Sequence, residues 1–241
     1  MKELARSMLE NEQEPAVNLL AIDTTSKISA VGLQAGKKRF QSVTKPEKSH
    51  SRDILPTIVE LAEEADTSLT DLDAIVFGKG PGSFTGMRIT VGVVQGLAYG
   101  LGIPVIPVSS LACLAQGEYR ESGATDTLVV LSARKEEVYF GAYQMQGGCP
   151  DLVGEEGVLH ASLVPPLEKL EWVGVGDGWG LRKELELAAG RQMKRISMEV
   201  SPQPQDLLDI GVVKLASGDI IDAMNALPEY LREKVAKKSQ A

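Results

Sequence analysis

The segment of this chain best suited to chemistry is a glycine-rich loop at residues 78–88, with the sequence GKGPGSFTGMR. It joins a short apolar segment, residues 74–77, to a long apolar stretch that we expect to form a helix from Phe84 to Tyr99. Ser83 is a good N-cap, and the first turn of a helix presents N–H groups that have no partner inside the helix. Such a loop could hold a phosphate, or it could be a tight turn packed against a neighbouring segment.

A second polar group, Asp23-Thr24-Thr25, follows an apolar segment at residues 18–22 that is typical of a buried strand. Open α/β sheets bind ligands beyond the carboxyl ends of their strands, so we expect this turn and the glycine loop at one edge. Asp23 could position the metal ion of a nucleotide, or its carboxylate could cap its own turn through Thr25 or Ser26. The candidate nucleotide or phosphate site therefore consists of Asp23, Thr24, Thr25, Gly80, Gly82 and Ser83.

The rest of the chain alternates between short apolar strands and amphipathic helices, a pattern that predicts an α/β fold. We expect strands at residues 28–34, 38–44, 103–108, 128–132, 138–143 and 172–175, and helices at 50–64, 109–116 and 206–216. The strand-turn-strand opening at residues 19–34 recurs about a hundred residues later, which indicates two related lobes.

This organisation predicts three parts. Residues 1–16 are an N-terminal extension, either disordered or a frayed helix, residues 17–109 form the first lobe, and residues 110–241 form the second lobe with a basic C-terminal tail. The 43% hydrophobic content is sufficient for a core in each lobe.

Composition and charge exclude several classes of protein. The net charge of −8 and the pI of about 5.0 argue against a chain that binds nucleic acid by itself, because such proteins carry a basic surface. No apolar run reaches the ~20 residues of a membrane span, and residues 1–15 lack the apolar core of a signal peptide. With only Cys113 and Cys149 there is no disulfide framework, so we expect a cytoplasmic protein.

Three segments now resemble one family closely. They are the LAIDTT sequence at residues 20–25, the glycine loop at 78–88, and the pair of short motifs SHS at 49–51 and ILP at 54–56. In these segments the chain resembles the bacterial TsaB family, also called YeaZ. The similarity is strong from residue 17 to about 120, is weaker through the second lobe, and returns at residues 228–232.

The resemblance implies an actin/hexokinase/Hsp70-like fold of two lobes and a role in tRNA modification. TsaB proteins are needed to place threonylcarbamoyl on the adenosine beside the anticodon of tRNAs that read codons starting with A. In this family TsaB is not the catalyst: it forms a heterodimer with the catalytic subunit TsaD and activates it, with the ATPase TsaE as a further partner. The same surface is expected to form a homodimer when the chain is alone, and tRNA is contacted only through the complex.

The family places this interface on the helices of the first lobe. Several glycines in one helix also suggest close packing, since each costs up to ~1 kcal/mol relative to alanine. The alternative is that they accommodate a helix or sheet within the same lobe. The residues expected at the partner interface are His50, Ile54, Ile58, Leu61, Gly86, Arg88, Gly92 and Gly96.

The resemblance also implies that this chain has no metal and no catalytic residue. TsaD holds its metal with two histidines spaced by one helical turn, and the matching positions here are Ser110 and Leu114. Nucleotide-cleaving members of the fold carry an acidic residue at the first turn of both lobes, whereas the repeat partner of Asp23 is the uncharged Ser132. We therefore expect no cofactor, with weak ATP or ADP binding at most.

Two alternatives remain open on the residues alone. One is a self-sufficient kinase or ATPase of the actin-like fold that uses Asp23 and the loop at 78–86. The other is a phosphate-binding regulator in which the loop holds an anion by itself.

Overall fold

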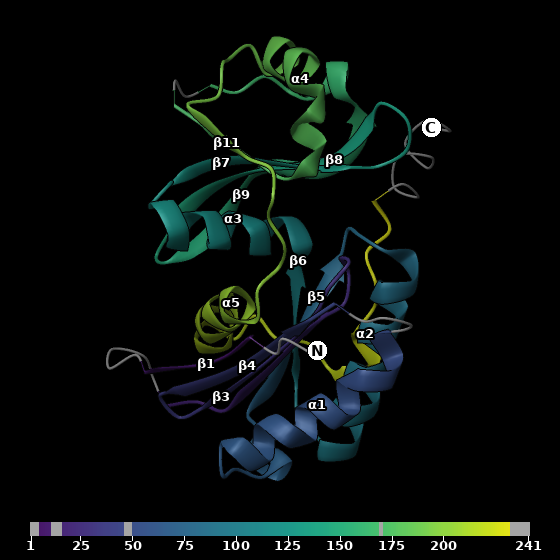
Figure 1. Cartoon of the computed structure of the whole chain (residues 1–241), viewed down its shortest axis with the longest axis vertical. Coiled ribbons are helices and arrows are strands. Elements are labelled where there is room, and N and C mark those ends of the chain that lie inside the picture. The colour runs from purple at the N-terminus through teal and green to yellow at the C-terminus, as the bar shows by residue number, and fades with distance from the viewer. Residues whose placement is uncertain (1–4, 11–15, 46–49, 169–170, 232–241) are drawn as a thin grey trace. The chain divides into compact units, whose positions relative to one another are not determined.

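The computed structural model describes residues 5–10, 16–45, 50–168 and 171–231 (Figure 1). By their internal contacts they form two compact units. The first contains the residues up to Ser110 together with Pro202–Pro228, and the second contains Leu111–Ser201 and the residues from Glu229 onward. Within the described residues, no helix is both long and apolar enough to cross a membrane.

The first unit is built on a six-stranded sheet with the order β1-β4-β3-β2-β5-β6. Its strands are β1 (Ala5–Glu10), β2 (Leu19–Asp23), β3 (Ser29–Ala35), β4 (Lys38–Thr44), β5 (Ala74–Gly80) and β6 (Val105–Ser109). Its helices are α1 (His50–Glu64), α2 (Phe84–Leu101) and α5 (Pro204–Ser217), with short 3-10 turns η1 (Leu69–Asp71) and η4 (Ala223–Asn225).

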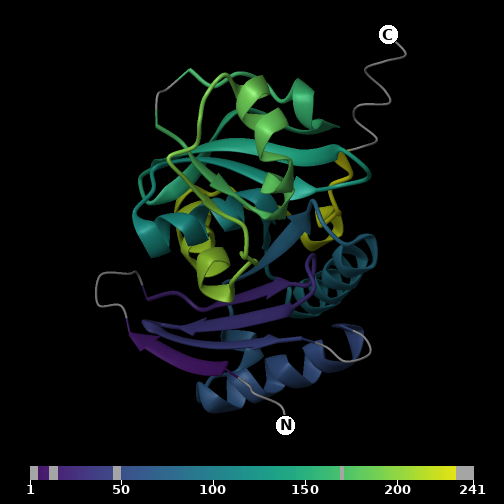
Figure 2. The same cartoon turned by 45° about the horizontal axis from the view of Figure 1, so that its top comes forward.

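Helices cover both faces of this sheet. One face packs against α1 and α2 around a core that includes Leu20, Ile75 and Phe77, while α5 lies against the opposite face (Figure 2). Successive side chains along a strand lie on opposite faces of the sheet. Because both faces are covered by helices, the central strands are apolar at residues 19–22 of β2 and 74–77 of β5.

The second unit is built on a five-stranded sheet with the order β11-β10-β7-β8-β9. Its strands are β7 (Asp126–Ser132), β8 (Glu137–Gln146), β9 (Cys149–His160), β10 (Val173–Val175) and β11 (Arg195–Ser197). The helix α3 (Ser110–Ser122) packs on one face, and α4 (Arg182–Ala189) with the 3-10 turns η2 (Ala161–Leu163) and η3 (Asp177–Leu181) covers the other.

The two sheets repeat one topology. The order β4-β3-β2-β5-β6 in the first sheet corresponds to β9-β8-β7-β10-β11 in the second, with two antiparallel pairs followed by two parallel pairs in each case. The repeated strand-turn-strand opening predicted from the sequence is therefore present, as the β2–β3 and β7–β8 hairpins.

The expected division at residue 110 differs from the structure for residues 202–228, which belong with the first unit rather than the second. Their helix α5 lies so close to β3 that a β-carbon at Gly32 would be 2.6 Å from Pro204 Cβ. Arg39 on β4 also donates to Asp209 Oδ1 on α5 at 2.6 Å. No local feature of the sequence signals that a segment so far along the chain packs back onto the first sheet.

Two further expectations need correction. The described part of the N-terminal extension is not a frayed helix: Ala5–Glu10 form β1, which pairs antiparallel with β4. The strand β9 was not predicted, because residues 151–155 are exposed and lack the apolar alternation of a half-buried strand.

Candidate functional site

The turn after β2 and the loop after β5 meet at one edge of the first sheet, because these two strands are parallel neighbours. Asp23 is 1% exposed. Its Oδ1 atom accepts hydrogen bonds from the Thr25 N–H at 2.7 Å and from the Thr25 hydroxyl at 2.8 Å. The carboxylate therefore caps its own turn, one of the two roles that the sequence left open.

The glycine loop packs directly onto this turn. A β-carbon at Gly82 would overlap Thr25 O, and one at Gly86 would overlap Thr24 O. A β-carbon at Gly78 would overlap Asp23 Oδ2 in the same way. These glycines are thus required for the close approach of two backbone segments within the unit.

Hydrogen bonds fix the same contact. The Ser83 N–H donates to Thr25 O at 2.6 Å, and the Ser83 hydroxyl oxygen accepts from the Gly86 N–H at 3.2 Å as the N-cap of α2. The Thr24 hydroxyl donates to Gly86 O at 2.8 Å, and the Thr24 N–H donates to the Thr90 hydroxyl oxygen at 3.1 Å. The N–H groups of Ser83 and Gly86, two of those that the loop could offer to a phosphate, are therefore already engaged inside the unit.

This packing makes a direct prediction about two glycines. We expect Gly82→Ala to destabilise the chain by about 1–3 kcal/mol, because the new methyl group has no space beside Thr25. The matched control is Gly96→Ala on α2, where a β-carbon meets nothing within 4 Å. That change should stabilise the chain by up to ~1 kcal/mol, since alanine is the better helix former. Urea unfolding of both variants measures the two changes in the free energy of unfolding. Equal changes would contradict the conclusion that Gly82 is packed against Thr25 while Gly96 is not.

Burial of the Asp23 carboxyl changes its pKa. Its Oδ2 atom is buried and has no hydrogen-bond partner within the part of the chain that the structure describes. Burial raises the pKa of the Asp23 carboxyl to about 6, while the two hydrogen bonds from Thr25 act in the opposite direction. This carboxyl lies against Gly78 and does not face solvent, so it is poorly placed to hold the metal ion of a nucleotide.

The two positions that match the histidine pair of TsaD, Ser110 and Leu114, have structural roles in this chain. Ser110 is buried, and its hydroxyl shares a 2.9 Å hydrogen bond with the Thr25 hydroxyl. Leu114 is 3% exposed and packs in the core beside β7 and β10. Within the described residues, the structure contains no group of three His, Cys, Asp or Glu side chains arranged to hold a metal ion.

A carboxylate that sequence reasoning missed lies beside the turn that follows β7, the strand of the second sheet that corresponds to β2. The Ser132 N–H at the end of β7 donates to Asp177 Oδ1 at 2.8 Å. Asp177 comes from the turn after β10, and Gly176 and Gly178 in that turn pack against Val130. The sequence signal that could have found this carboxylate is Gly-Asp-Gly at residues 176–178. The repeat hides it, because Asp23 aligns with Ser132 and not with Asp177.

The predicted interface residues divide into two groups. Ile54, Ile58 and Leu61 are each 1% exposed and lie in the core of the first unit, so these side chains cannot contact a partner directly. They recur at the helical spacing that places them all on the face of α1 toward the sheet. Gly86 faces Thr24 for the reason given above, and the His50 side chain lies outside the described residues.

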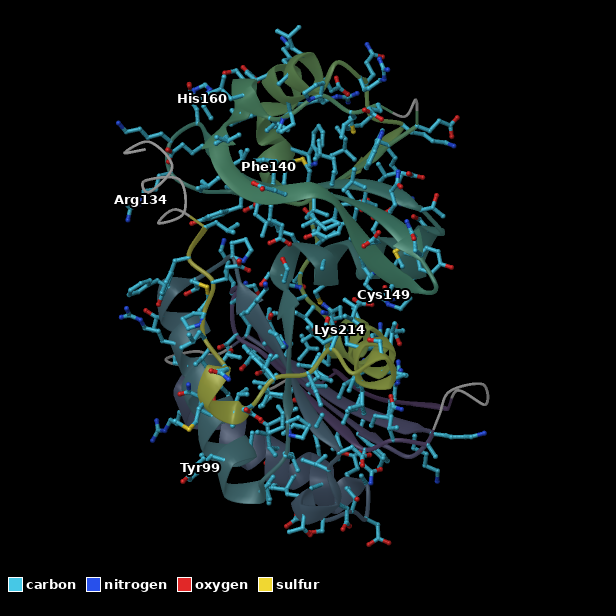
Figure 3. All side chains as sticks on the ribbon, turned by 180° about the vertical axis from the view of Figure 1, so that it is seen from behind. Tyr99, Arg134, Phe140, Cys149, His160 and Lys214 are labelled. Atoms are coloured by element: carbon cyan, nitrogen blue, oxygen red, sulfur yellow. The ribbon has the colours of Figure 1, made fainter. Side chains whose placement is uncertain are left out.

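The outward face of the same helices is open. Leu55 and Val59 on α1 are 49% and 48% exposed. On α2, β-carbons at Gly92 and Gly96 would meet nothing within 4 Å, so these glycines do not accommodate a neighbour inside the unit. Tyr99, on the same helix, projects outward and is 75% exposed (Figure 3).

Arg88 lies at the beginning of this outward surface. It is exposed, and its guanidinium carbon lies 3.7 Å from the centroid of the Phe84 ring, which is 53% exposed. This cation–π contact leaves both side chains accessible at the first turns of α2.

Two units that repeat one strand order, each a mixed sheet with helices on both faces, define the class of protein, a duplicated α/β fold. The family model of TsaD, described as tRNA N6-adenosine threonylcarbamoyltransferase, matches residues 43–239. The tRNA threonylcarbamoyladenosine biosynthesis protein TsaB of Escherichia coli K12 is 37% identical over 226 residues, covering 92% of this chain and 97% of that protein. The crystallised YeaZ of Pseudomonas aeruginosa is 39% identical with a TM-score of 0.83, over 89% of this chain and 100% of that one.

The chain therefore belongs to the TsaB (YeaZ) family of tRNA threonylcarbamoyladenosine biosynthesis, within the wider group that the TsaD family model describes. The TsaB of Bacillus subtilis is 29% identical over 222 residues, covering 90% of this chain and 94% of that protein.

Proposed function

We propose that this chain is a non-catalytic subunit that binds TsaD through the outward face of α1 and α2 and holds it in its active form. TsaD would then transfer threonylcarbamoyl to the adenosine beside the anticodon in the cytoplasm. The observation that supports this role most directly is the open surface of α1 and α2, with exposed apolar side chains on one helix and exposed glycines on the other. A partner that binds one conformer preferentially shifts its population toward that conformer.

The contacts around Asp23 support a role without catalysis. The turn and the glycine loop use their polar groups on each other, and the matching positions for the histidine pair of TsaD are Ser110 and Leu114. We infer that the chain needs no cofactor and that any ATP or ADP binding is weak. This favours the scaffold role over a stand-alone kinase or ATPase.

Further partners follow from the same role. We propose TsaE as a third component, a homodimer through the same surface when TsaD is absent, and contact with tRNA only through the complex. The net charge of −8 is consistent with tRNA being held mainly by other subunits.

The decisive experiment is co-purification of this chain with its cognate TsaD, followed by a tRNA-modification assay with and without the chain. A stable complex whose activity depends on the chain supports the proposal. If TsaD is fully active without this chain, or if the two proteins form no complex, the stand-alone ATPase becomes the favoured function. ATP hydrolysis by the isolated chain is then the next measurement.

A glycine substitution locates the surface. We expect Gly92→Leu to weaken the TsaD complex by at least about tenfold, because a large side chain on the outward face of α2 would hold the docked surface of TsaD away from this helix. The matched control is Gly180→Leu in the second unit, where a β-carbon also meets nothing within 4 Å. Binding measured by titration calorimetry should fall for the first variant only, with both variants folded by circular dichroism.

A further inference from the structure

A serine, a histidine and a glutamate of the second unit are joined by two hydrogen bonds. The His160 Nδ1 atom lies 2.8 Å from the Ser162 hydroxyl oxygen, and its Nε2 atom lies 2.7 Å from Glu136 Oε2. All three residues are exposed, and the His160 side chain is 44% exposed (Figure 3). They belong to the second unit, whereas Asp23 and the glycine loop belong to the first, so this cluster is separate from the site described above.

The partners of the imidazole ring decide which nitrogen carries its proton. A carboxylate oxygen accepts hydrogen bonds, so Nε2 is the nitrogen that donates, to Glu136. Neutral His160 then has a lone pair at Nδ1, which accepts from the Ser162 hydroxyl. The Ser162 N–H also donates to this Nδ1 atom, at the longer distance of 3.4 Å, as the cap of η2. The Ser162 hydroxyl thus donates its proton toward an unprotonated nitrogen, which is a base.

The backbone holds these residues in place independently of their side chains. Glu137 is paired with His160 across β8 and β9, and the Ala161 N–H donates to Glu136 O at 2.9 Å. Ala161 itself is fully buried. The turn before β8 and the beginning of η2 are therefore already joined without the imidazole and the carboxylate. Side chains that fixed elements hold in one arrangement are what a nucleophilic site requires.

The arrangement matches the chemistry of an activated serine. A hydroxyl is a weak nucleophile unless a neighbouring base takes its proton as it attacks. The diagnostic geometry is a serine within about 2.6–3.2 Å of a base that a third group orients, and both distances in this cluster fall in that range. In the Ser-His-Asp triad the serine contacts Nε2 and the carboxylate contacts Nδ1. Here the two nitrogens exchange partners, and the order of serine, base and carboxylate is the same.

We infer that Ser162 is the nucleophile of a second site, which acts on small carboxylic esters with His160 as general base and Glu136 as positioning residue. The Ser162 Oγ atom forms a bond to the carbonyl carbon while its proton moves to His160 Nδ1. The bond to the leaving alcohol then breaks, and the alcohol takes that proton. Water cleaves the acyl-serine in the same way and releases the carboxylic acid.

The surroundings of Ser162 define the class of ester. The neighbouring Leu163 is 64% exposed, so the acyl group that fits beside the nucleophile is a short apolar one. This activity goes beyond the proposed role in tRNA modification and does not depend on it.

The first test is covalent labelling of the full chain with a fluorophosphonate, a reagent that modifies activated serines and leaves ordinary serines unchanged. The Ser162 oxygen displaces fluoride from phosphorus, and its proton passes to His160. We expect the label at Ser162 by peptide mapping with mass spectrometry, and none in Ser162→Ala. The matched control is Ser217→Ala, which should be labelled like the wild type. Ser217 is also exposed, but its hydroxyl donates to the Lys214 carbonyl oxygen, which is not a base.

Two further positions test the roles of the base and the carboxylate. His160→Ala should lower the labelling rate about a hundredfold, and free imidazole in the buffer should restore part of it. Glu136→Gln should lower the rate at least about tenfold, because its amide can donate to Nε2 and so place the histidine proton on Nδ1. Glu136→Asp keeps an accepting carboxylate and should retain more of the rate. Equal rates in the two Glu136 variants would exclude Glu136 from the site.

Hydrolysis of p-nitrophenyl acetate is the second readout, and the wild-type chain should exceed Ser162→Ala by at least about tenfold. Labelling and hydrolysis that both depend on Ser162 support the inference. A wild-type chain that takes up no fluorophosphonate, or takes it up at another residue, overturns it. Label at Ser162 without hydrolysis above that of Ser162→Ala overturns the assignment of esters as substrates. Both variants should have the circular dichroism spectrum of the folded chain.

Discussion

The Ile58→Asp variant is expected to be unfolded or severely destabilised, whereas Val59→Asp, one residue further along α1, should fold like the wild type. Ile58 is 1% exposed in the core of the first unit, and an aspartate there would lose the apolar contacts and bury a charge. We expect a loss of more than about 4 kcal/mol in the free energy of unfolding. Val59 is 48% exposed, so its change should remain within about 0.5 kcal/mol.

Urea unfolding followed by circular dichroism measures both effects, and binding to TsaD provides the second readout. Val59→Asp should remain folded and lose partner affinity, because Val59 lies in the middle of the proposed docking face. The pair thus separates a folding defect from a binding defect with neighbouring residues of the same helix. A folded Ile58→Asp chain would show that this helix face is not the core face.

This pair also shows where sequence reasoning reaches its limit. The sequence ILPTIVELA at residues 54–62 has apolar residues on two adjacent sides of the helix, and periodicity alone does not say which side faces the sheet. The bounds of α1 and β4 were predicted correctly because their periodicity is strong. The direction in which Ile54 and Leu55 point depends on the sheet beneath them, which is a tertiary feature.

The candidate site shows the same division. The sequence indicated that Asp23 and the glycine loop meet at one edge, since parallel strands place their carboxyl ends together, and the structure confirms that contact. The purpose of the glycines was not decidable, because a loop that cradles phosphate and a loop that packs on a turn need the same residue type. Contacts that join distant segments, such as Ser132 with Asp177 and Gly32 with Pro204, have no local sequence signal.

The second large effect expected is a pH dependence of stability that originates at Asp23. Burial raises the pKa of Asp23 to about 6 in the folded chain, against 3.8 for an exposed aspartate. The folded state therefore holds this proton more tightly than the unfolded state. The resulting stabilisation is fully present below about pH 4 and is lost as the pH rises through about 6. The total change is on the order of 3 kcal/mol, since one pKa unit corresponds to about 1.4 kcal/mol.

The Asp23→Asn variant removes the titrating group and keeps an Oδ1 atom for the two donors of Thr25. Its free energy of unfolding, measured by urea titration from pH 4 to pH 7.5, should fall less with rising pH than that of the wild type. The difference between the two chains should change by about 3 kcal/mol across this range, in favour of the variant at pH 7.5. A constant difference would mean that Asp23 titrates at its ordinary pKa and is not buried as described.

The direction of this effect bears on the functional argument. A carboxylate that holds a metal ion is stabilised in its charged form, and its pKa is lowered by the cation. In the chain without a metal ion, burial raises the pKa of Asp23 instead, so a cation that reached this carboxylate would reverse the direction of the shift. If millimolar Mg²⁺ with ATP leaves the pH profile of the wild-type chain unchanged, Asp23 acts as the cap of its turn. A profile that becomes flat in their presence would instead identify Asp23 as part of a nucleotide site and favour the ATPase alternative.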